Sequence, residues 1–368
     1  GVQTCALPIY LIWGRARLAG AGVVEVADSG VPAPRGALGP GSYAAPHVIL
    51  ATGARPRVLP GLEPDGRLVW TYMQALRPEA IPARLVVVGS GAIGVEFASI
   101  YAAMGVQVTL VELADRILPA EDAEISGLMA KALQKRGIAI LTGVSVTRLD
   151  RGGDSLTAHL SDGTAVMADR LLSAVGVVPN VSGLGLETLG VVFRHGAVLT
   201  EGAGRTNVPG LYAIGDVAGP PMLAHKAEHE GIACVEAIAG RPVHATGPVP
   251  ACIYANPQVA SVGLTEAAAA ERGVALRVGR FSLRGNGKAL VVGEPDGLVK
   301  CLFDAATDRI VGAQVIGAEA SELIHGLTIA VSLGATSAQL AHVVFPHPTL
   351  SEALHEAVLA AREGAIHA

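Results

Sequence analysis

LVVVGSGAIG, residues 85–94, is the stretch that decides the fold of this chain. Its apolar start, Leu85–Val88, is typical of a strand buried on both faces of a parallel sheet. Helical periodicity follows over Ala92–Met104, and Gly105 is placed to end that helix. Val106–Val111 then predicts a second buried strand, so the stretch opens one βαβ unit. One side of this helix carries Ile93, Phe97, Ile100 and Tyr101.

Three glycines of this stretch have the spacing G-x-G-x-x-G. Gly89 permits the tight turn, Gly91 lets the backbone approach a pyrophosphate, and Gly94 lets helix and strand pack closely. Glu112, 18 residues after Gly94, can accept hydrogen bonds from an adenosine ribose and would repel a 2′-phosphate. The pattern therefore favours NAD over NADP, although Arg116 keeps NADP open. A strand–turn–helix corner without a ligand is the alternative.

The segments on either side of this unit differ in character. The elements expected before and after it are strands at Leu11–Trp13, Gly22–Val26 and His47–Ala51, a helix at Ala123–Arg136, and strands at Ile138–Leu141, Arg170–Ala174 and Gly210–Ile214. From about Pro248 strands precede helices, an order typical of a separate α+β domain. Those strands are expected at Ile253–Gly263, Leu276–Leu283, Gly297–Asp304 and Ile310–Gly317, and the helices at Glu319–Leu333, Ser337–Ala341 and Ser351–Arg362.

Composition excludes several classes of protein. Hydrophobic residues make up 51% of the chain and charged residues 16%, which suits large buried α/β cores and argues against disorder. The net charge of -5, without a run of Lys or Arg, indicates neither a nucleic-acid partner nor an anionic membrane surface. No apolar stretch is long enough to span a bilayer, so no membrane partner is expected.

The cysteines do not predict a metal or redox site. Cys5, Cys234, Cys252 and Cys301 form no C-x-x-C pair, and the histidines are scattered. We therefore expect no metal site. We interpret the cysteines as free structural thiols in a reducing cytoplasm.

Two further motifs place polar residues beside predicted elements. Asp216 ends the strand of Thr206–Asp216 (TNVPGLYAIGD), at the end of a parallel sheet where ligands bind; a helix N-cap is the alternative. His347 precedes a helix start, with Glu352 five residues on. A carboxylate bonded to one imidazole nitrogen fixes the tautomer and raises basicity, which makes a general acid/base. From spacing alone, a satisfied surface histidine is the better interpretation.

In this order the motifs resemble the pyridine nucleotide–disulphide oxidoreductases, and within that family dihydrolipoamide dehydrogenase. The resemblance extends from about Ile12 to Ala368. Its motifs are Ala51–Gly53 (ATG), the glycine turn at 89–94, Val208–Asp216 (VPGLYAIGD), Met222–Ala227 (MLAHKA), Pro257–Gly263 (PQVASVG) and His347–Glu352 (HPTLSE). It implies an α/β fold of interleaved FAD- and NAD-binding Rossmann-like domains, with the FAD domain incomplete, plus a C-terminal α+β dimerisation domain.

The domain boundaries that we expect follow from this resemblance. They are 10–80 for a remnant of the FAD-binding domain, 81–205 for the NAD-binding domain, 206–247 for the second part of the FAD-binding domain and 248–368 for the dimerisation domain. Residues 1–9 read GVQTCALPI, which is also one translation of a common sequencing adapter. We expect these nine residues to be an artefact and exclude them from the fold.

The resemblance implies an FAD site. Asp216 would hold the ribityl chain, and Thr52 and Gly53 would line the site. Leu223 and Ala224 would present backbone N–H groups at a helix start to the flavin pyrimidine edge, where the reduced ring carries negative charge.

It also implies the remaining roles. Glu96 would lie near the nicotinamide and the flavin, beside an NAD site made by the glycine turn and Glu112. His347 would exchange a proton with the dithiol, oriented by Glu352. In the family this histidine reaches the disulphide of the partner subunit, so the resemblance implies a homodimer.

The implied function is oxidation of protein-bound dihydrolipoamide to lipoamide with FAD and NAD⁺. The chain would serve as the third component of a 2-oxo acid dehydrogenase complex, and its partner would be the lipoyl domain of the second component. Phe345 stands where many relatives have histidine, and Val177 where the reductases often have arginine.

One absence is larger. The family's N-terminal G-x-G-x-x-G for FAD and its C-x-x-x-x-C redox pair are not in this sequence, so we expect the chain to be inactive alone. A non-catalytic dinucleotide-binding or dimerisation protein is one alternative. A glutathione or mercuric reductase is another, disfavoured by Glu112 and by the absence of a terminal cysteine pair.

Overall fold

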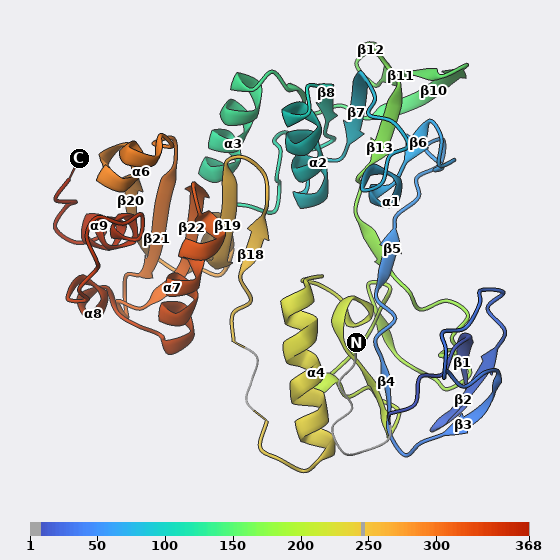
Figure 1. Cartoon of the computed structure of the whole chain (residues 1–368). Coiled ribbons are helices and arrows are strands. Elements are labelled where there is room, and N and C mark those ends of the chain that lie inside the picture. The colour runs from blue at the N-terminus through green and yellow to red at the C-terminus, as the bar shows by residue number, and fades with distance from the viewer. Residues whose placement is uncertain (1–8, 244–246, 368) are drawn as a thin grey trace. The chain divides into compact units, whose positions relative to one another are not determined.

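The structure is a computed structural model that describes residues 9–243 and 247–367 (Figure 1). The chain forms two compact units. Unit 1 contains the described residues up to Arg55 and those from Val177 to 243. Unit 2 contains Pro56–Gly176 and the described residues from Gly247 onward.

The stretch at 85–94 lies at the centre of a parallel sheet in unit 2. The strand order is β6-β13-β7-β8-β9, and all neighbours are parallel. The strands are β6 (Val69–Trp70), β7 (Arg84–Val88), β8 (Gln107–Val111), β9 (Ala139–Leu141) and β13 (Arg170–Ser173). The expected strand at Leu85–Val88 is confirmed as β7, and its four residues are buried because helices or strands cover both faces.

Helices and a small antiparallel sheet complete this half of unit 2. They are α1 (Tyr72–Ala75), α2 (Ala92–Ala103), α3 (Ala123–Lys135), β10 (Val146–Gly152), β11 (Ser155–Leu160) and β12 (Ala165–Ala168). Ile100, on the apolar side noted in the sequence, is 41% exposed, whereas Val95 of the same helix is fully buried. Nearly every residue of this helix is apolar or small, so its periodicity did not identify the buried side.

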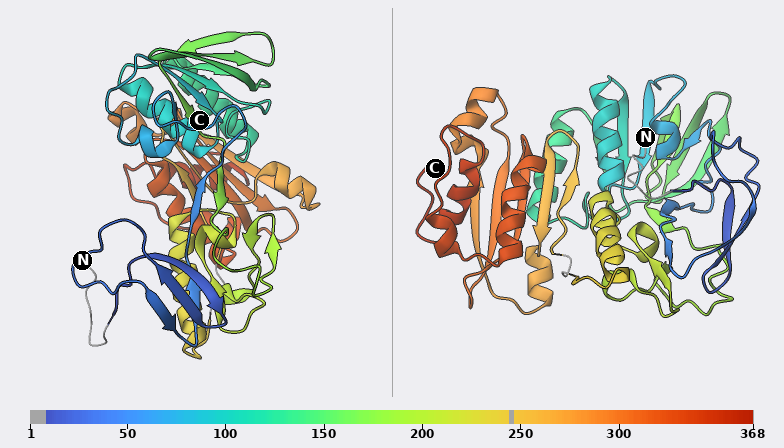
Figure 2. Two further views of the ribbon diagram at one scale, coloured as in Figure 1. Left: turned by 90° about the vertical axis from the view of Figure 1, so that its right-hand side faces the viewer. Right: turned by 60° about the horizontal axis from the view of Figure 1, so that its bottom comes forward.

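The second half of unit 2 is a five-stranded antiparallel sheet with helices. The strand order is β18-β19-β22-β21-β20. Its elements are β18 (Ala251–Ile253), β19 (Gln258–Gly263), α5 (Glu266–Glu271), β20 (Leu276–Ser282), α6 (Gly287–Val292), β21 (Leu298–Asp304), β22 (Ile310–Gly317), α7 (Ala320–Leu333), α8 (Ser337–Ala341) and α9 (Glu352–Ala360), with a 3-10 turn at Leu283–Gly285. Figure 2 shows α7 and α9 in red over the orange strands; α7 contacts β19 and β22, and α9 contacts β20 and β21.

The other face of this sheet meets the nucleotide half of unit 2, which is the half that contains the parallel sheet and its glycine turn. Ile253, Val259 and Ile316 belong to the same apolar core as Met129 and Leu133 of α3. The expected strand range Ile253–Gly263 is divided into β18 and β19 by a turn that contains Pro257, because proline cannot donate to a strand ladder. The two halves of unit 2 therefore share one core.

Unit 1 is smaller and built mostly from strands. Its elements are β1 (Arg15–Gly20), β2 (Val23–Ala27), β3 (Gly41–Ala44), β4 (Val48–Leu50), β5 (Ala54–Pro56), β14 (Val177–Pro179), β15 (Phe193–Arg194), β16 (Ala197–Val198), β17 (Leu211–Ala213) and α4 (Ala224–Ile238), with 3-10 turns at Gly202–Gly204 and Gly215–Ala218. β4 and β17 pair in parallel, and their Leu50, Leu211 and Ala213 are buried in one core.

The start of the chain differs from the expectation. The predicted strand Leu11–Trp13 is wrong, since only Ile12 makes an isolated bridge there. The first strand is β1, which pairs with β2. Its sequence, RARLAG, has a single large apolar residue, so the pattern gave no signal. The expectation about residues 1–9 lies, except for Ile9, outside the described residues.

The compact units change over at 55/56 and 176/177. The expected domain boundaries at 80/81 and 205/206 describe the family's domains and stay a prediction.

Candidate functional site

The glycine turn after β7 has the geometry that a dinucleotide requires. Gly89 has φ 95°, and a Cβ there would meet the Ala174 carbonyl oxygen at 2.5 Å. A Cβ on Gly94 would meet the Gly89 carbonyl oxygen at 1.9 Å, so only glycine fits. A Cβ on Gly91 would meet nothing within 4 Å, so the space beside it is open. Gly91 is also the N-cap of α2 and makes no side-chain cap, which leaves the first N–H groups of the helix for an anion.

Glu112 follows β8 and binds the same turn. Its carboxylate accepts hydrogen bonds from Ser90 N at 2.8 Å and Ser90 Oγ at 2.7 Å, and from Ala114 N at 2.8 Å. Burial alone would raise the pKa of Glu112, but these hydrogen bonds outweigh burial and hold the pKa below its ordinary value. The carboxylate is therefore ionised at neutral pH and keeps lone pairs for ribose hydroxyls.

Arg116, which kept NADP open, is engaged elsewhere. Its Nη2 donates to the Pro119 carbonyl at 3.0 Å, and it lines a cavity of about 570 Å³ with Asp122 and Lys300. The structure therefore gives no support to a 2′-phosphate site at Arg116.

Glu96 lies on α2, two residues after Gly94. Its Oε1 accepts from the backbone N–H of Tyr254 at 2.8 Å. The residue is half-buried, and its position links the nucleotide half of unit 2 to the segment after β18. Its expected place near a nicotinamide stays a prediction.

Unit 1 brings the predicted FAD residues to the ends of two paired strands. Thr52 and Gly53 follow β4, and Asp216 follows β17. Thr52 Oγ1 donates to the Asn180 carbonyl at 2.8 Å, and Asn180 Nδ2 donates to the Thr52 carbonyl at 2.9 Å. A Cβ on Gly53, where φ is 68°, would meet nothing within 4 Å, so this turn is open on that side.

The turn that carries Asp216 is held by two residues without a predicted role. Gly215 N donates to Glu230 at 2.7 Å, and Lys226 Nζ donates to the Gly219 carbonyl at 3.0 Å. Lys226 and Glu230 also form an ion pair at 3.0 Å, one turn apart on α4. Their i, i+4 spacing after the glycine turn is the signal that the sequence offered.

Leu223 and Ala224 stand at the start of α4, as predicted. Leu223 is the N-cap and makes no side-chain cap. The first N–H groups of this 15-residue helix are thus available to a group that carries negative charge. The residues present in unit 1 fit an FAD pyrimidine edge.

His347 and Glu352 meet as the sequence suggested. His347 Nδ1 lies 2.9 Å from Glu352 Oε1, and Thr349 N donates to Glu352 Oε2 at 2.9 Å. The Thr349 N–H and His347 hold the pKa of Glu352 below its ordinary value. The His347 side chain is 79% exposed, and Nε2 is the ring nitrogen that does not bind Glu352. This geometry is the one that a general acid/base requires, and the role itself stays a prediction.

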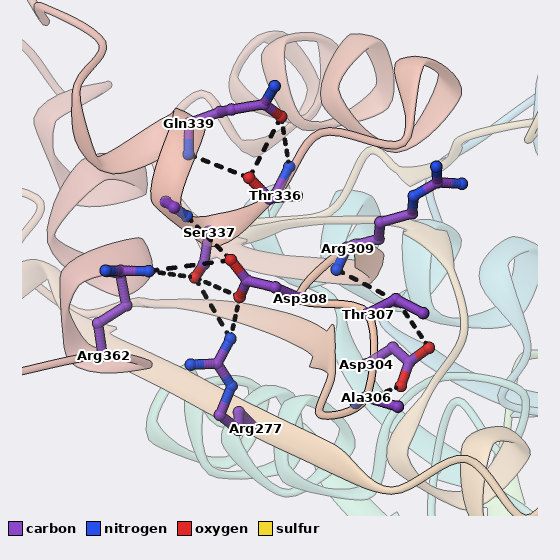
Figure 3. Close-up of polar contacts among 11 residues, drawn as sticks. Arg277, Asp304, Ala306, Thr307, Asp308, Arg309, Thr336, Ser337, Gln339 and Arg362 are labelled. Atoms are coloured by element: carbon purple, nitrogen blue, oxygen red, sulfur yellow. Dashed lines mark hydrogen bonds and ion pairs between the residues drawn. The ribbon is translucent and has the colours of Figure 1, made fainter.

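A polar network anchors the helices on either side of the His347 loop (Figure 3). Asp308, in the turn between β21 and β22, accepts from Ser337 Oγ at 2.6 Å and pairs with Arg277 of β20. Arg362, just after α9, donates to the same Ser337 Oγ at 2.9 Å. Because Ser337 opens α8, the network ties α8 and the end of α9 to the sheet.

A second histidine–glutamate pair on α9 was missed by the sequence analysis. Glu356 is buried and lies one turn after Glu352. It accepts from His367 Nδ1 and from Ile366 N, both at 2.7 Å. A glutamate four residues after the predicted one was the available signal.

No disulphide joins cysteines in the described part of the chain. Cys234 and Cys301 are buried, Cys252 is half-buried, and all three are free; Cys5 lies outside the described residues. Burial raises the pKa of the Cys301 thiol to about 12. Among the described residues no helix is both long and apolar enough to cross a membrane.

Known proteins match this chain along most of its length. The family described as pyridine nucleotide-disulphide oxidoreductase matches residues 16–231, and the dimerisation domain of that family matches residues 249–358.

The chain is similar in sequence to dihydrolipoyl dehydrogenases and in structure to LpdA and RclA. The dihydrolipoyl dehydrogenase of Rhizobium etli is 55% identical over 365 residues, which cover 95% of this chain and 76% of that protein. That of Zymomonas mobilis is 49% identical over 331 residues, covering 88% of this chain and 71% of the relative. Among solved structures, LpdA from Mycobacterium tuberculosis has a TM-score of 0.85 at 31% identity, covering 95% of this chain and 76% of that one. The HOCl-induced flavoprotein disulfide reductase RclA from Escherichia coli has a TM-score of 0.84 at 25% identity, covering 94% and 78%.

Proposed function

We propose, from the premise that this chain belongs to the pyridine nucleotide-disulphide oxidoreductase family, that it carries the acid/base and NAD sites of a dihydrolipoyl dehydrogenase. The family is one of flavoenzymes that use FAD and NAD, and the matched dimerisation domain supports a homodimer. The observation that carries the proposal is the His347–Glu352 pair, 2.9 Å apart within the region that matches the dimerisation domain.

The acid/base pair acts on the dithiol. Glu352 holds the Nδ1 proton of His347, so Nε2 is the nitrogen that accepts a proton from a thiol of dihydrolipoamide. The resulting thiolate is the nucleophile of disulphide exchange. Bound FAD supplies the two-electron chemistry that links a dithiol to NAD⁺.

The nucleotide sites bind and orient the two cofactors. Gly89, Gly91 and Gly94 let the NAD pyrophosphate reach the start of α2, and Glu112 accepts from the ribose hydroxyls. Glu96, near the start of the same helix, lies beside the nicotinamide.

In unit 1, Asp216 holds the FAD ribityl chain, and Thr52 and Gly53 line its site. Leu223 and Ala224 present N–H groups to the flavin.

The physiological setting is part of the proposal. The substrate is lipoamide on the lipoyl domain of a 2-oxo acid dehydrogenase complex, which this enzyme serves as third component. The 368 residues contain no C-x-x-x-x-C pair, so we propose that the chain does not turn over alone. The cytoplasmic location expected from the sequence stays a prediction.

A chimera tests the function. The part of the Rhizobium etli relative that precedes the region matched by this chain is fused ahead of Leu11. We expect a yellow protein that reduces NAD⁺ with dihydrolipoamide, whereas the chain by itself should show no turnover.

His347→Gln in the chimera should lower the rate about 100-fold, because the thiol then has no proton acceptor. His342→Gln, a change in a nearby histidine, is the matched control and should leave the rate unchanged. A yellow, dimeric chimera without activity, or a fully active His347→Gln variant, would contradict the proposal.

A further inference from the structure

A buried lysine joins the two halves of unit 2. Lys300 of β21 is 1% exposed. Its Nζ lies 2.8 Å from Asp122 Oδ1 and 3.0 Å from Glu124 Oε2, and it also pairs with Glu266. Asp122 and Glu124 belong to the start of α3 in the nucleotide half, whereas Lys300 and Glu266 belong to the C-terminal half. One ammonium group therefore connects both halves.

The strand register explains why a lysine points there. Alternate residues of β21, Val299, Cys301 and Phe303, lie in the core under α7 and α9. Lys300 consequently points to the opposite face, toward α3. Arg280 is its direct neighbour on β20, and two cations opposite each other repel. Glu124 and Glu266 each bind both cations, with Arg280 at 2.8 and 2.7 Å, which removes that repulsion.

The ion cluster is charged at neutral pH. Burial alone would lower the pKa of Lys300, but hydrogen bonds to the three carboxylates outweigh burial and raise it. Burial alone would likewise raise the pKa of Asp122, but Lys300 and the backbone N–H groups of Glu124 and Glu266 together lower it. A buried cation with three carboxylate partners holds the start of α3 in one position.

The start of α3 in turn supports the glycine turn. Asp122 is the N-cap of α3 and accepts from Glu124 N at 3.0 Å. Ser126, fully buried in the first turns of α3, donates to the Ile117 carbonyl at 2.5 Å. The next residue, Leu118, donates through its backbone N–H to the Ser90 carbonyl at 2.9 Å. Ser90 stands between the first two glycines of the G-x-G-x-x-G turn.

Segment 112–122 therefore contacts Ser90 from two sides. At its start, Glu112 accepts from Ser90 N and Oγ, and in its middle Leu118 donates to the Ser90 carbonyl. Its far end is Asp122, bound to Lys300. A shift of Asp122 would move the segment that holds both the turn and the ribose-binding carboxylate.

We infer that Lys300, in the C-terminal half of unit 2, is a positioning residue for the NAD site. It fixes the start of α3, and through segment 112–122 it keeps Ser90 and Glu112 in the geometry that binds the dinucleotide. The inference rests on the proposed NAD site at Gly89–Gly94 and Glu112.

NADH binding to the whole chain tests the inference without turnover. The dissociation constant is measured by NADH fluorescence for the unmodified chain and for Lys300→Met, at a temperature at which both are folded by circular dichroism. We expect Lys300→Met to bind NADH about tenfold more weakly, the size usual for a residue that acts through others. Lys300→Arg keeps the cation and should stay within about threefold of the unmodified chain.

Lys135→Met is the matched control. Lys135 is on the same helix and also pairs with the C-terminal half, at Asp296, but it is 76% exposed. This variant should bind NADH as the unmodified chain does. Asp122→Asn is a second test in case Lys300→Met does not fold, because asparagine caps a helix as well as aspartate but loses the ion pair. It should bind about threefold more weakly, within the usual range for such couplings.

The outcomes are decisive. Unchanged NADH affinity in folded Lys300→Met overturns the inference, as does unchanged affinity in Asp122→Asn if Lys300→Met is unfolded. Equal losses in Lys300→Met and Lys135→Met, or in Lys300→Met and Lys300→Arg, also overturn it. Failure of the proposed NAD site is distinguishable, because the unmodified chain would then bind no NADH at all.

Discussion

Among the described residues each unit contains one buried lysine, and the two lysines have different partners. Lys226 in unit 1 is 7% exposed, and Lys300 in unit 2 is 1% exposed. Lys226 binds one carboxylate, Glu230 on the same helix, and the carbonyl of Gly219 seven residues earlier. Lys300 binds three carboxylates, and its bond to Asp122 spans 178 positions of the chain.

The difference shows two ways to hold a glycine turn for which we propose nucleotide binding. In unit 1 the lysine and its glutamate hold the Gly215 turn directly, from the adjacent helix. In unit 2 the turn at Ser90 is held by Glu112, and the lysine acts at the far end of the supporting segment. The Lys226–Glu230 contact depends on the spacing of residues along one helix. The Lys300–Asp122 contact depends on how the two halves of unit 2 pack together.

Lys300→Met should have the largest effect on stability. The substitution leaves Asp122, and two half-exposed glutamates, without their shared cation in a buried contact. We expect unit 2 to lose about 3 kcal/mol in its free energy of unfolding, the range for a broken buried pair. Denaturant unfolding followed by Trp70 fluorescence, in a Trp13→Phe background, measures this, since the chain has two tryptophans and Trp70 lies in the unit 2 core. A loss below about 1 kcal/mol would mean that the cluster is not a strong contact.

Lys226→Met should cost less. Glu230 is partly exposed and can turn to water, so the main loss is the bond to the Gly219 carbonyl. We expect about 2 kcal/mol less stability in unit 1, measured by Trp13 fluorescence against a Trp70→Phe parent. A larger loss than that of Lys300→Met would reverse the comparison.

Acid should weaken the contribution of the Lys300 cluster to the stability of unit 2. The folded-state pKa values of Asp122 and Glu124 lie below their ordinary 3.8 and 4.5. Their contribution is therefore present above those values and is lost as the pH falls through the folded-state pKa values. In Lys300→Met burial is no longer opposed by the ammonium, so these carboxyl groups should take up protons more readily.

The stability gap between the unmodified chain and Lys300→Met should consequently narrow as the pH falls from 5 to 3. The narrowing of this gap should be smaller than the stability that Lys300→Met loses at neutral pH, because acid removes only part of the cluster's contribution. Denaturant midpoints at several pH values measure the gap, and a gap that widens in acid would contradict the assigned charges.

Lys135→Met should have the smallest effect. Its partner Asp296 is also more than half exposed, so the pair is screened by water and salt. We expect a change of no more than about 0.5 kcal/mol in the Trp70 transition. A loss comparable with that of Lys300→Met would show that burial does not separate the two pairs.

Much of the fold followed from local patterns. The strand at Leu85–Val88 and the helix at Ser337–Ala341 lie where the sequence predicted, because an apolar run and a capped turn are short-range signals. The predicted strand at Leu11–Trp13 was wrong, and the apolar side noted on α2 includes the exposed Ile100. An all-apolar helix does not mark its buried side, and β1 pairs through its backbone without an apolar pattern.

The sequence likewise predicted some residues of the candidate sites and missed others. The glycine spacing at 89–94 and the five-residue spacing from His347 to Glu352 were readable, and the geometry agrees with both. Glu356 was missed because its partner, His367, comes from the chain end, which folds back onto α9.

By itself the sequence determined the βαβ unit, its glycine turn and carboxylate, and the histidine that stands beside a helix start. These depend on contacts between near neighbours, which strand and helix periodicity fix. Only the tertiary structure decided that Lys300 meets Asp122 and that Arg280 shares its carboxylates. Those contacts follow from which faces of the C-terminal sheet and of α3 pack together, and no spacing along the chain encodes that choice.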